Sequence, residues 1–130
     1  AKALELAMDT YKQDSAYVAE LKQYMITLLE ENIADVSFNG DYNGSSLYTI
    51  LNVSLPKTEK SEVLLYTLDM NGICISGGSA CSSGASHASH VITCVCKDPD
   101  RVALRFSFSK HNTKEELVYT VNKMKELMQG

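Results

Sequence analysis

Apolar residues recur every three or four positions in the first quarter of the chain, the spacing that places them on one face of a helix. This pattern predicts a helix over residues 12–32. Asp14 and Ser15 are expected to cap it if residues 1–10 form a separate helical piece. The predicted apolar face consists of Val18, Leu21, Met25 and Leu28.

Two further helices are indicated by the residues at their ends. Residues 62–71 are predicted to form a helix that closes at Asn71 and Gly72, because these residue types are favoured where a helix ends in the left-handed region. The last helix begins with a capping-box pattern, in which Thr113 is followed three positions later by Glu116. Its predicted apolar face consists of Leu117, Val121, Met124 and Met128.

Short apolar runs bounded by turn-forming residues predict strands. Residues 35–38 and 47–53 are expected to form a hairpin that Pro56 ends. A third strand is predicted over residues 72–75, and a fourth, with alternating faces, over 101–108. About four strands among helices predict an α/β (α+β) fold, a two-layer sandwich with one sheet face packed by helices and the other at least partly free.

Size and composition limit the classes of protein to consider. At 130 residues the chain fits one domain, so residues 1–130 are expected to form a single domain. Its apolar runs are too short for a membrane span, and a net charge of −4 without a basic stripe disfavours nucleic acid. Four cysteines are too few for a disulfide scaffold, and the first residues do not form a signal-sequence pattern. These features favour a soluble protein with reduced thiols in the cytoplasm.

A run of small residues around Cys81 is the most informative chemical feature. Residues 76–86 contain five Ser, three Gly and two Ala beside this single cysteine. Such a segment cannot build a core, so we expect a mobile arm that makes the thiol accessible. A cysteine with an ordinary pKa of about 8.5 is only slightly ionised at neutral pH, so the group that activates Cys81 must lie elsewhere in the fold.

Two other candidate residues lie on predicted strands. Arg105 is expected on the face opposite Leu104 and Phe106, where its guanidinium can hold a carboxylate through two parallel hydrogen bonds. The alternation by itself also fits a surface arginine in a salt bridge. Cys74, inside the apolar run 73–75, is interpreted as a small core residue.

Two histidines and two cysteines downstream of Cys81 indicate a different chemistry. His87, His90 and Cys94 share one face if residues 87–96 are helical, and Cys96 follows closely. Because these residue types bind zinc, a stand-alone thiol or zinc-binding module is the alternative hypothesis. A two-residue step on a helix separates side chains by about 200°, which disfavours convergence of the two cysteines.

Three segments taken together resemble a known family. The run ISGGSACSSG, the later SHV, and the run LRFSFSKHNTKEEL resemble the C-terminal portion of a cysteine desulfurase, in the NifS-like branch of the class V aminotransferases. Residues 1–7 also resemble the helix that links the large and small domains of that family. The resemblance therefore implies the C-terminal small domain of a fold-type I pyridoxal-phosphate enzyme, with the large cofactor-binding domain absent.

The resemblance also implies roles for individual residues. Cys81 is the expected nucleophile, which takes sulfur from L-cysteine as a persulfide, leaves L-alanine and passes the sulfur to an acceptor or iron–sulfur scaffold protein. Arg105 is expected to bind the substrate α-carboxylate. The parent enzyme is expected to be a homodimeric cytoplasmic transferase that serves iron–sulfur cluster assembly. A preference between cysteine and selenocysteine stays open.

The same family attaches its pyridoxal phosphate to a lysine in a Ser-x-His-Lys setting on the large domain. No His-Lys pair occurs in this chain, so the resemblance implies that the covalent cofactor site lies outside it and that the fragment alone is inactive. If Cys81 and Arg105 belong to one active site, the segment 73–75 and the strand of Arg105 should share a sheet edge.

Overall fold

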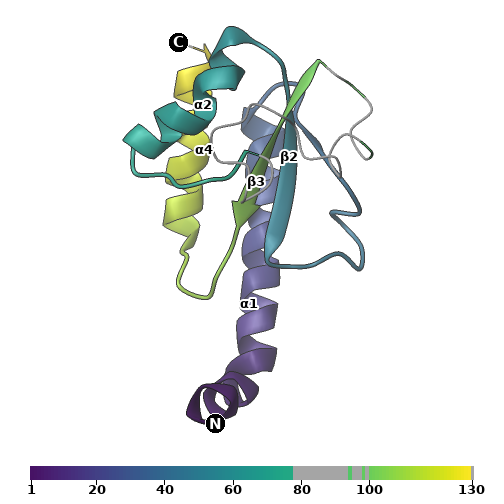
Figure 1. Cartoon of the computed structure of the whole chain (residues 1–130), viewed down its shortest axis with the longest axis vertical. Helices are drawn as coiled ribbons and strands as arrows, with labels where there is room; N and C mark the ends of the chain where they lie inside the picture. Colours follow the sequence, from purple (N-terminus) through teal and green to yellow (C-terminus); the bar gives the residue numbers. More distant parts are fainter. Residues whose placement is uncertain (78–93, 95–97, 99, 130) are drawn as a thin grey trace.

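The computed structural model describes residues 1–77, 94, 98 and 100–129. The described residues form a three-stranded antiparallel sheet with helices packed on it, which confirms the predicted fold class. In chain order the elements are α1 (Lys2–Asn32), β1 (Ser37–Phe38), β2 (Ile50–Pro56), α2 (Glu59–Met70), β3 (Arg101–Ser107) and α4 (Lys114–Gln129). Figure 1 shows the helices beside β2 and β3.

The sheet has the strand order β1-β2-β3, and both neighbouring pairs are antiparallel. The predicted hairpin is confirmed, since Ser37 of β1 lies opposite Ser54 of β2. The predicted strand over residues 72–75 does not form. That segment begins in the turn at Gly72 and meets the sheet only at Ser76, in an isolated bridge to Arg105 on the outer edge of β3.

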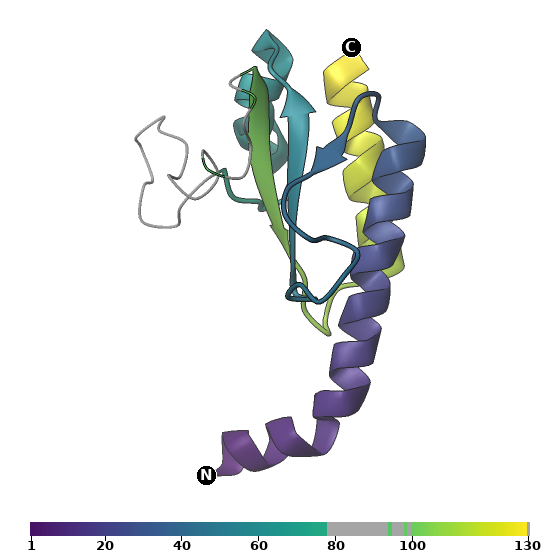
Figure 2. The same cartoon turned by 90° about the vertical axis from the view of Figure 1, so that its right-hand side faces the viewer.

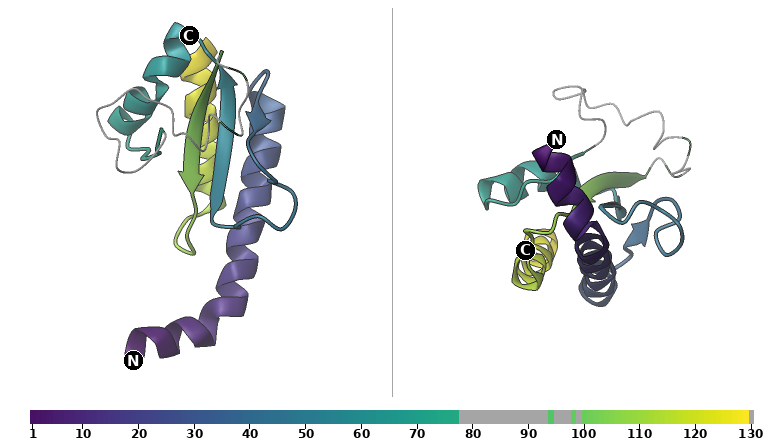
Figure 3. Two further views of the ribbon diagram at one scale, coloured as in Figure 1. Left: turned by 45° about the vertical axis from the view of Figure 1, so that its right-hand side comes forward. Right: turned by 90° about the horizontal axis from the view of Figure 1, so that it is seen from below.

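The core lies between the sheet and two helices. Figure 2 shows α1 and α4 against one face of the sheet, and Figure 3 shows α2 beside α4, past the β3 edge. Alternate residues of the strands point into this layer, as expected for a sheet with one buried face. The inward residues of β2 and β3 include Leu51, Val53, Leu55, Leu104 and Phe106, all of them buried.

Helix α1 is continuous through the position where a cap was predicted. Asp14 and Ser15 lie within it, so the prediction that they cap a second helix is wrong. The Asp14 carboxylate instead accepts hydrogen bonds from the Thr10 hydroxyl at 2.7 Å and from the Lys110 ammonium at 2.8 Å. Figure 2 shows that the first turns of α1 bend away and project beyond the sheet. No helix among the described residues is long and apolar enough to cross a membrane.

The ends of the other two helices follow local rules. Helix α2 begins earlier than predicted, because Thr58 and Ser61 form a capping box in which each side chain accepts from the backbone N–H of the other. It closes at Gly72, whose φ of 76° lies in the left-handed region, as predicted. At α4, the predicted box is confirmed: the Thr113 N–H donates to the Glu116 carboxylate at 3.1 Å, and the Glu116 N–H donates to the Thr113 hydroxyl at 3.3 Å.

The core packing leads to a first prediction. Leu21→Ala should lower the free energy of unfolding by about 2–5 kcal/mol, because the fully buried side chain leaves a cavity. Leu4→Ala, in the same helix at a position that is 66% exposed, is the matched control and should change it by less than about 0.5 kcal/mol. Urea denaturation of both variants measures the difference. Equal losses would show that α1 is not packed on the sheet as described.

The Asp14 contact leads to a second prediction. The hydrogen bond from Lys110, with a second from Thr10, holds the pKa of Asp14 below its ordinary value of 3.8. A lowered folded-state pKa stabilises the fold above the unfolded pKa, and this contribution is lost as the pH falls through the folded pKa. Between about pH 5 and pH 2, thermal melts of Asp14→Asn should therefore lose less stability than those of the wild type. Parallel curves for the two proteins would contradict the contact.

Candidate functional site

The sheet face turned away from α1 and α4 carries the polar residues of β2 and β3. The register places Ser54 opposite Ala103 and Asn52 opposite Arg105, with Arg101 on the same face at the start of β3. Two arginines four residues apart therefore lie on one face. Their hydrogen bonds differ, and that difference identifies the candidate site.

The Arg101 guanidinium is held by hydrogen bonds to β2 and to the turn before β1. Its Nε donates to the Ser54 hydroxyl at 2.8 Å, and its Nη2 donates to the backbone carbonyls of Ser54 at 2.8 Å and Asp35 at 2.6 Å. Its Nη1 lies 3.3 Å from the Asp35 carboxylate, and the side chain is only 14% exposed. Asp35 has a φ of 54°, so this arginine holds a left-handed turn at the entrance to β1.

The hydrogen-bond donors of the Arg105 guanidinium are only partly paired among the described residues. Its Nη2 lies 3.4 Å from the Ser76 hydroxyl, beyond the usual length of such a hydrogen bond. Its Nε is buried and has no hydrogen-bond partner among the described residues. A buried donor without an acceptor costs about 1–3 kcal/mol, so this guanidinium is arranged to receive an acceptor from outside these strands. The predicted placement of Arg105 opposite the face of Leu104 and Phe106 is confirmed.

Asn52 joins this site, and the residue pattern of the sequence did not single it out. It lies opposite Arg105 in the β2–β3 register, and its side-chain oxygen accepts from the Asn39 amide at 2.7 Å. The backbone N–H of Asn39 also donates to the carbonyl of Asn52 at 3.0 Å. Only the pairing register, which joins positions 53 residues apart, brings Asn52 beside Arg105, so no local motif could have identified it.

The segment that leads to Cys81 begins beside Arg105. The N–H of Ser76 donates to the carbonyl of Arg105 at 3.1 Å, and the N–H of Arg105 donates to the carbonyl of Ser76 at 2.7 Å. The expected shared edge is therefore present, as a bridge instead of a strand. Cys81 itself lies outside the described residues, as does most of the arm for which mobility was predicted.

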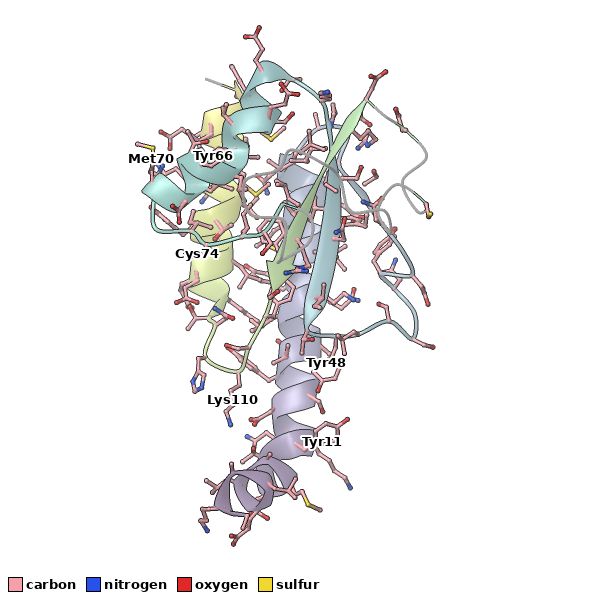
Figure 4. The ribbon with its side chains drawn as sticks, in the orientation of Figure 1. Tyr11, Tyr48, Tyr66, Met70, Cys74 and Lys110 are labelled. Atoms are coloured by element: carbon pink, nitrogen blue, oxygen red, sulfur yellow. The ribbon has the colours of Figure 1, made fainter. Side chains whose placement is uncertain are left out.

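The interpretation of Cys74 as a core residue is wrong, because its side chain is exposed. Ile73 is buried and Ile75 is partly buried, so the intervening side chain points the other way. The thiol lies 3.7 Å from a carboxylate oxygen of Asp69 at the end of α2, and Figure 4 shows it at the surface below that helix. An apolar flanking sequence did not imply burial here, because the segment contacts the core on one side only.

Most of the candidate zinc ligands lie outside the described residues, namely His87, His90 and Cys96. Cys94 is described, and its side chain is exposed. Within the described part of the chain no three His, Cys, Asp or Glu side chains come together as metal ligands. Cys74 and Cys94 are both free thiols.

Lys22 fixes the loop between β1 and β2. It is a buried residue of α1, and its ammonium donates to the Ser46 hydroxyl at 2.9 Å and to the Leu47 carbonyl at 3.1 Å. Burial lowers the pKa of this lysine, and the nearby Asp41 carboxylate partly offsets the effect. Asn39 and Asn52 line a recess together with residues of this anchored loop.

Comparison with known proteins assigns the family. Residues 1–119 match the class-V aminotransferase family. The chain is 34% identical to "Cysteine desulfurase IscS" of Dictyoglomus turgidum, covering 98% of this chain and 32% of the relative. It is 31% identical to "Cysteine desulfurase" of Rattus norvegicus, covering 93% of this chain and 26% of the relative.

Solved structures agree with this assignment at the level of the fold. A protein described as NifS-like has a TM-score of 0.74 at 23% identity, covering 98% of this chain and 31% of the other. A NifS-like protein from Rickettsia africae also has a TM-score of 0.74, at 20% identity and with 96% and 32% covered. The chain belongs to the class-V aminotransferases. Its curated relatives are cysteine desulfurases, and it spans about a third of the length of the first of them.

The contrast between the two arginines leads to a third prediction. Arg101→Ala should lower the free energy of unfolding by about 1–3 kcal/mol, because it removes the hydrogen bonds that a charged group donates to the carbonyls of Asp35 and Ser54. Arg105→Ala is the matched variant on the same face. It should lower the free energy of unfolding by no more than about 0.5 kcal/mol, since it removes a buried donor that has no partner in the described part of the chain. Denaturant titration of both variants checks this, and a larger loss for Arg105→Ala would reverse the assignment.

Proposed function

We propose that residues 1–130 are the C-terminal small domain of a pyridoxal-phosphate-dependent cysteine desulfurase, with Arg105 binding the α-carboxylate of L-cysteine and Cys81 accepting its sulfur. The observation that carries this proposal is the buried Nε of Arg105, which has no partner among the described residues and lies beside the segment that leads to Cys81. A guanidinium with free donors suits a carboxylate, because both groups are planar and can pair through two hydrogen bonds. The family assignment supports the same conclusion.

In the proposed reaction the Cys81 thiolate attacks the sulfur of L-cysteine, so that an S–S bond forms as the Cβ–S bond breaks. The electron pair of the broken bond stays on Cβ, which takes up a proton and becomes the methyl group of L-alanine. Both sulfurs are oxidised by one electron and the carbon is reduced by two, so no external oxidant is needed. The resulting Cys81 persulfide is then delivered to a sulfur acceptor or iron–sulfur scaffold protein.

The strand residues of this chain do not supply a covalent cofactor site. The residues of β2 and β3 on the face of Arg105 are Ile50, Asn52, Ser54, Pro56, Arg101, Ala103, Arg105 and Ser107, and no lysine is among them. The C–S cleavage needs an electron sink, which is the chemistry that pyridoxal phosphate supplies in this family. Because no His-Lys pair occurs in this sequence, we place the cofactor lysine in another part of a longer enzyme and expect the 130-residue chain alone to lack desulfurase turnover.

An exposed apolar surface supports an assembly larger than this chain. The first turns of α1 expose Leu4, Leu6, Met8 and Tyr11 by half or more of their surface. Tyr11 lines a recess with Tyr48 and Lys110 at the lower end of the sheet, and Figure 4 shows these three side chains together there. Exposed apolar side chains of this kind are typical of an interface, and we assign them to contact with the large domain of the same enzyme. A homodimeric cytoplasmic enzyme is the form we propose for the whole protein.

The fourth prediction concerns the intact enzyme. Arg105→Ala should raise the KM for L-cysteine roughly tenfold or more, the value of a lost hydrogen bond to a charged group. Cys81→Ala should bind L-cysteine with unchanged affinity and form neither persulfide nor sulfide. Spectroscopic titration with cysteine measures binding, and mass spectrometry of the trapped protein shows whether Cys81 gains one sulfur atom.

Cys74→Ala is the matched thiol control, because its exposed sulfur contacts Asp69 and takes no part in the proposed reaction. It should retain wild-type sulfide release. If Cys81→Ala delivers sulfur to an acceptor at the wild-type rate, the proposed role of Cys81 is wrong. If Arg105→Ala leaves the KM for L-cysteine unchanged, the carboxylate assignment is wrong.

A further inference from the structure

Four polar residues form a row across the sheet on the face of Arg105. Asn39 follows β1, Asn52 lies on β2, Arg105 lies on β3, and Ser76 bridges to the outer edge of β3. We propose that Asn52 is a second hydrogen-bond donor to the carboxylate bound by Arg105, and that Asn39 orients the Asn52 amide for this role. This inference rests on the proposed function, in which Arg105 binds a carboxylate.

The backbone hydrogen bonds place Asn52 and Arg105 close together. In an antiparallel sheet the N–H and C=O of one residue point to the same neighbouring strand. Both of these groups of Arg105 pair with Ser76, so neither pairs with Asn52. The register therefore makes Asn52 and Arg105 a non-hydrogen-bonded pair, the kind in which facing Cα atoms are only about 4.5 Å apart and the side chains are closest.

Asn39 determines which end of the Asn52 amide is available to bind a ligand. The Nδ2 of Asn39 donates to the Oδ1 of Asn52 at 2.7 Å, which commits that oxygen toward β1. An asparagine beside an arginine would otherwise turn its side-chain oxygen toward the guanidinium, because this oxygen is the only acceptor in the asparagine side chain. With the oxygen engaged by Asn39, the Nδ2 of Asn52 has no hydrogen-bond partner among the described residues.

Two adjacent donors without an acceptor favour a ligand with two acceptor atoms. The Nε of Arg105 is buried and unpartnered in the described part of the chain, and Asn52 lies opposite Arg105 on the same face of the strand pair. A carboxylate has two oxygens on one planar group, so one oxygen can accept from the guanidinium while the other accepts from the amide. A primary amide ligand offers one oxygen and a donor, which Asn52 would repel. The site should therefore discriminate carboxylates from carboxamides.

The test uses the 130-residue chain, labelled with ¹⁵N, in NMR titrations with acetate or acetamide at constant ionic strength. Acetate should shift the Arg105 Nε–H and Asn52 Nδ2–H signals together, and acetamide should shift neither. Asn52→Ala should weaken acetate binding at Arg105 roughly tenfold, the effect of one hydrogen bond to a charged group. Asn52→Asp should abolish it, because the new carboxylate pairs with Arg105.

The variant Asn39→Asp tests the orientation of the Asn52 amide while the amide itself is kept. The aspartate accepts from Asn52, so the amide turns its oxygen toward Arg105 and acetate binding should weaken as much as in Asn52→Ala. Ser107→Ala, an exposed residue two positions from Arg105 on the same strand, is the control and should bind as the wild type does. Dispersed backbone spectra establish that each variant is folded.

The possible failures are distinguishable. If acetate does not shift Arg105 in the wild-type chain, the carboxylate role of Arg105 fails and the role of Asn52 fails with it. If Arg105 responds equally in the wild type and in Asn52→Ala, the proposed function stands and the inference about Asn52 is overturned. If Asn39→Asp binds like the wild type, the orienting role of Asn39 is overturned.

Discussion

The antiparallel pairing of β2 with β3 is the constraint on which the rest of the structure depends. It places Leu51 opposite Phe106 and Val53 opposite Leu104 on the face covered by α1 and α4. Because side chains alternate along a strand, the same register must place Asn52 opposite Arg105 on the other face. A slip of one residue would bury these polar side chains and expose the core. Core and candidate site are therefore fixed by the same hydrogen bonds.

The two arginines of β3 show how neighbours decide the use of the same side chain. Arg101 lies at the end of the strand where β1 begins, and the carbonyls and carboxylate of that turn occupy its donors. Arg105 lies four residues further along, where the β2 neighbour on its face is an asparagine and the other side is bridged by Ser76. The first arginine stabilises the fold, whereas the second keeps a buried donor that no acceptor among the described residues satisfies. Incomplete satisfaction of this kind is a common property of binding sites, because a ligand supplies the missing partner.

The described part of the chain combines a well-packed core with surfaces that lack partners within it. Leu21 of α1, Leu64 of α2 and Leu55 of β2 are fully buried, while the first turns of α1 expose apolar side chains to solvent. Relatives about three times as long contain this segment as one part of their chain. The exposed turns of α1 and the Arg105 Nε, which lacks an acceptor among the described residues, both support our proposal of a domain that completes its site against another part of a longer enzyme.

Local sequence determined the parts of the structure that depend on neighbours in the chain. The capping box at Thr113, the helix end at Gly72 and the alternation around Arg105 followed directly from residue type and spacing. Tertiary contacts decided the rest. Asp14 lies within a continuous helix and binds Lys110, 96 residues away, and Cys74 is exposed because its segment touches the sheet only at Ser76. The neighbours of Arg105 could not be predicted from the sequence for the same physical reason. The register of paired strands brings together residues that are distant along the chain, and only the folded sheet sets that register.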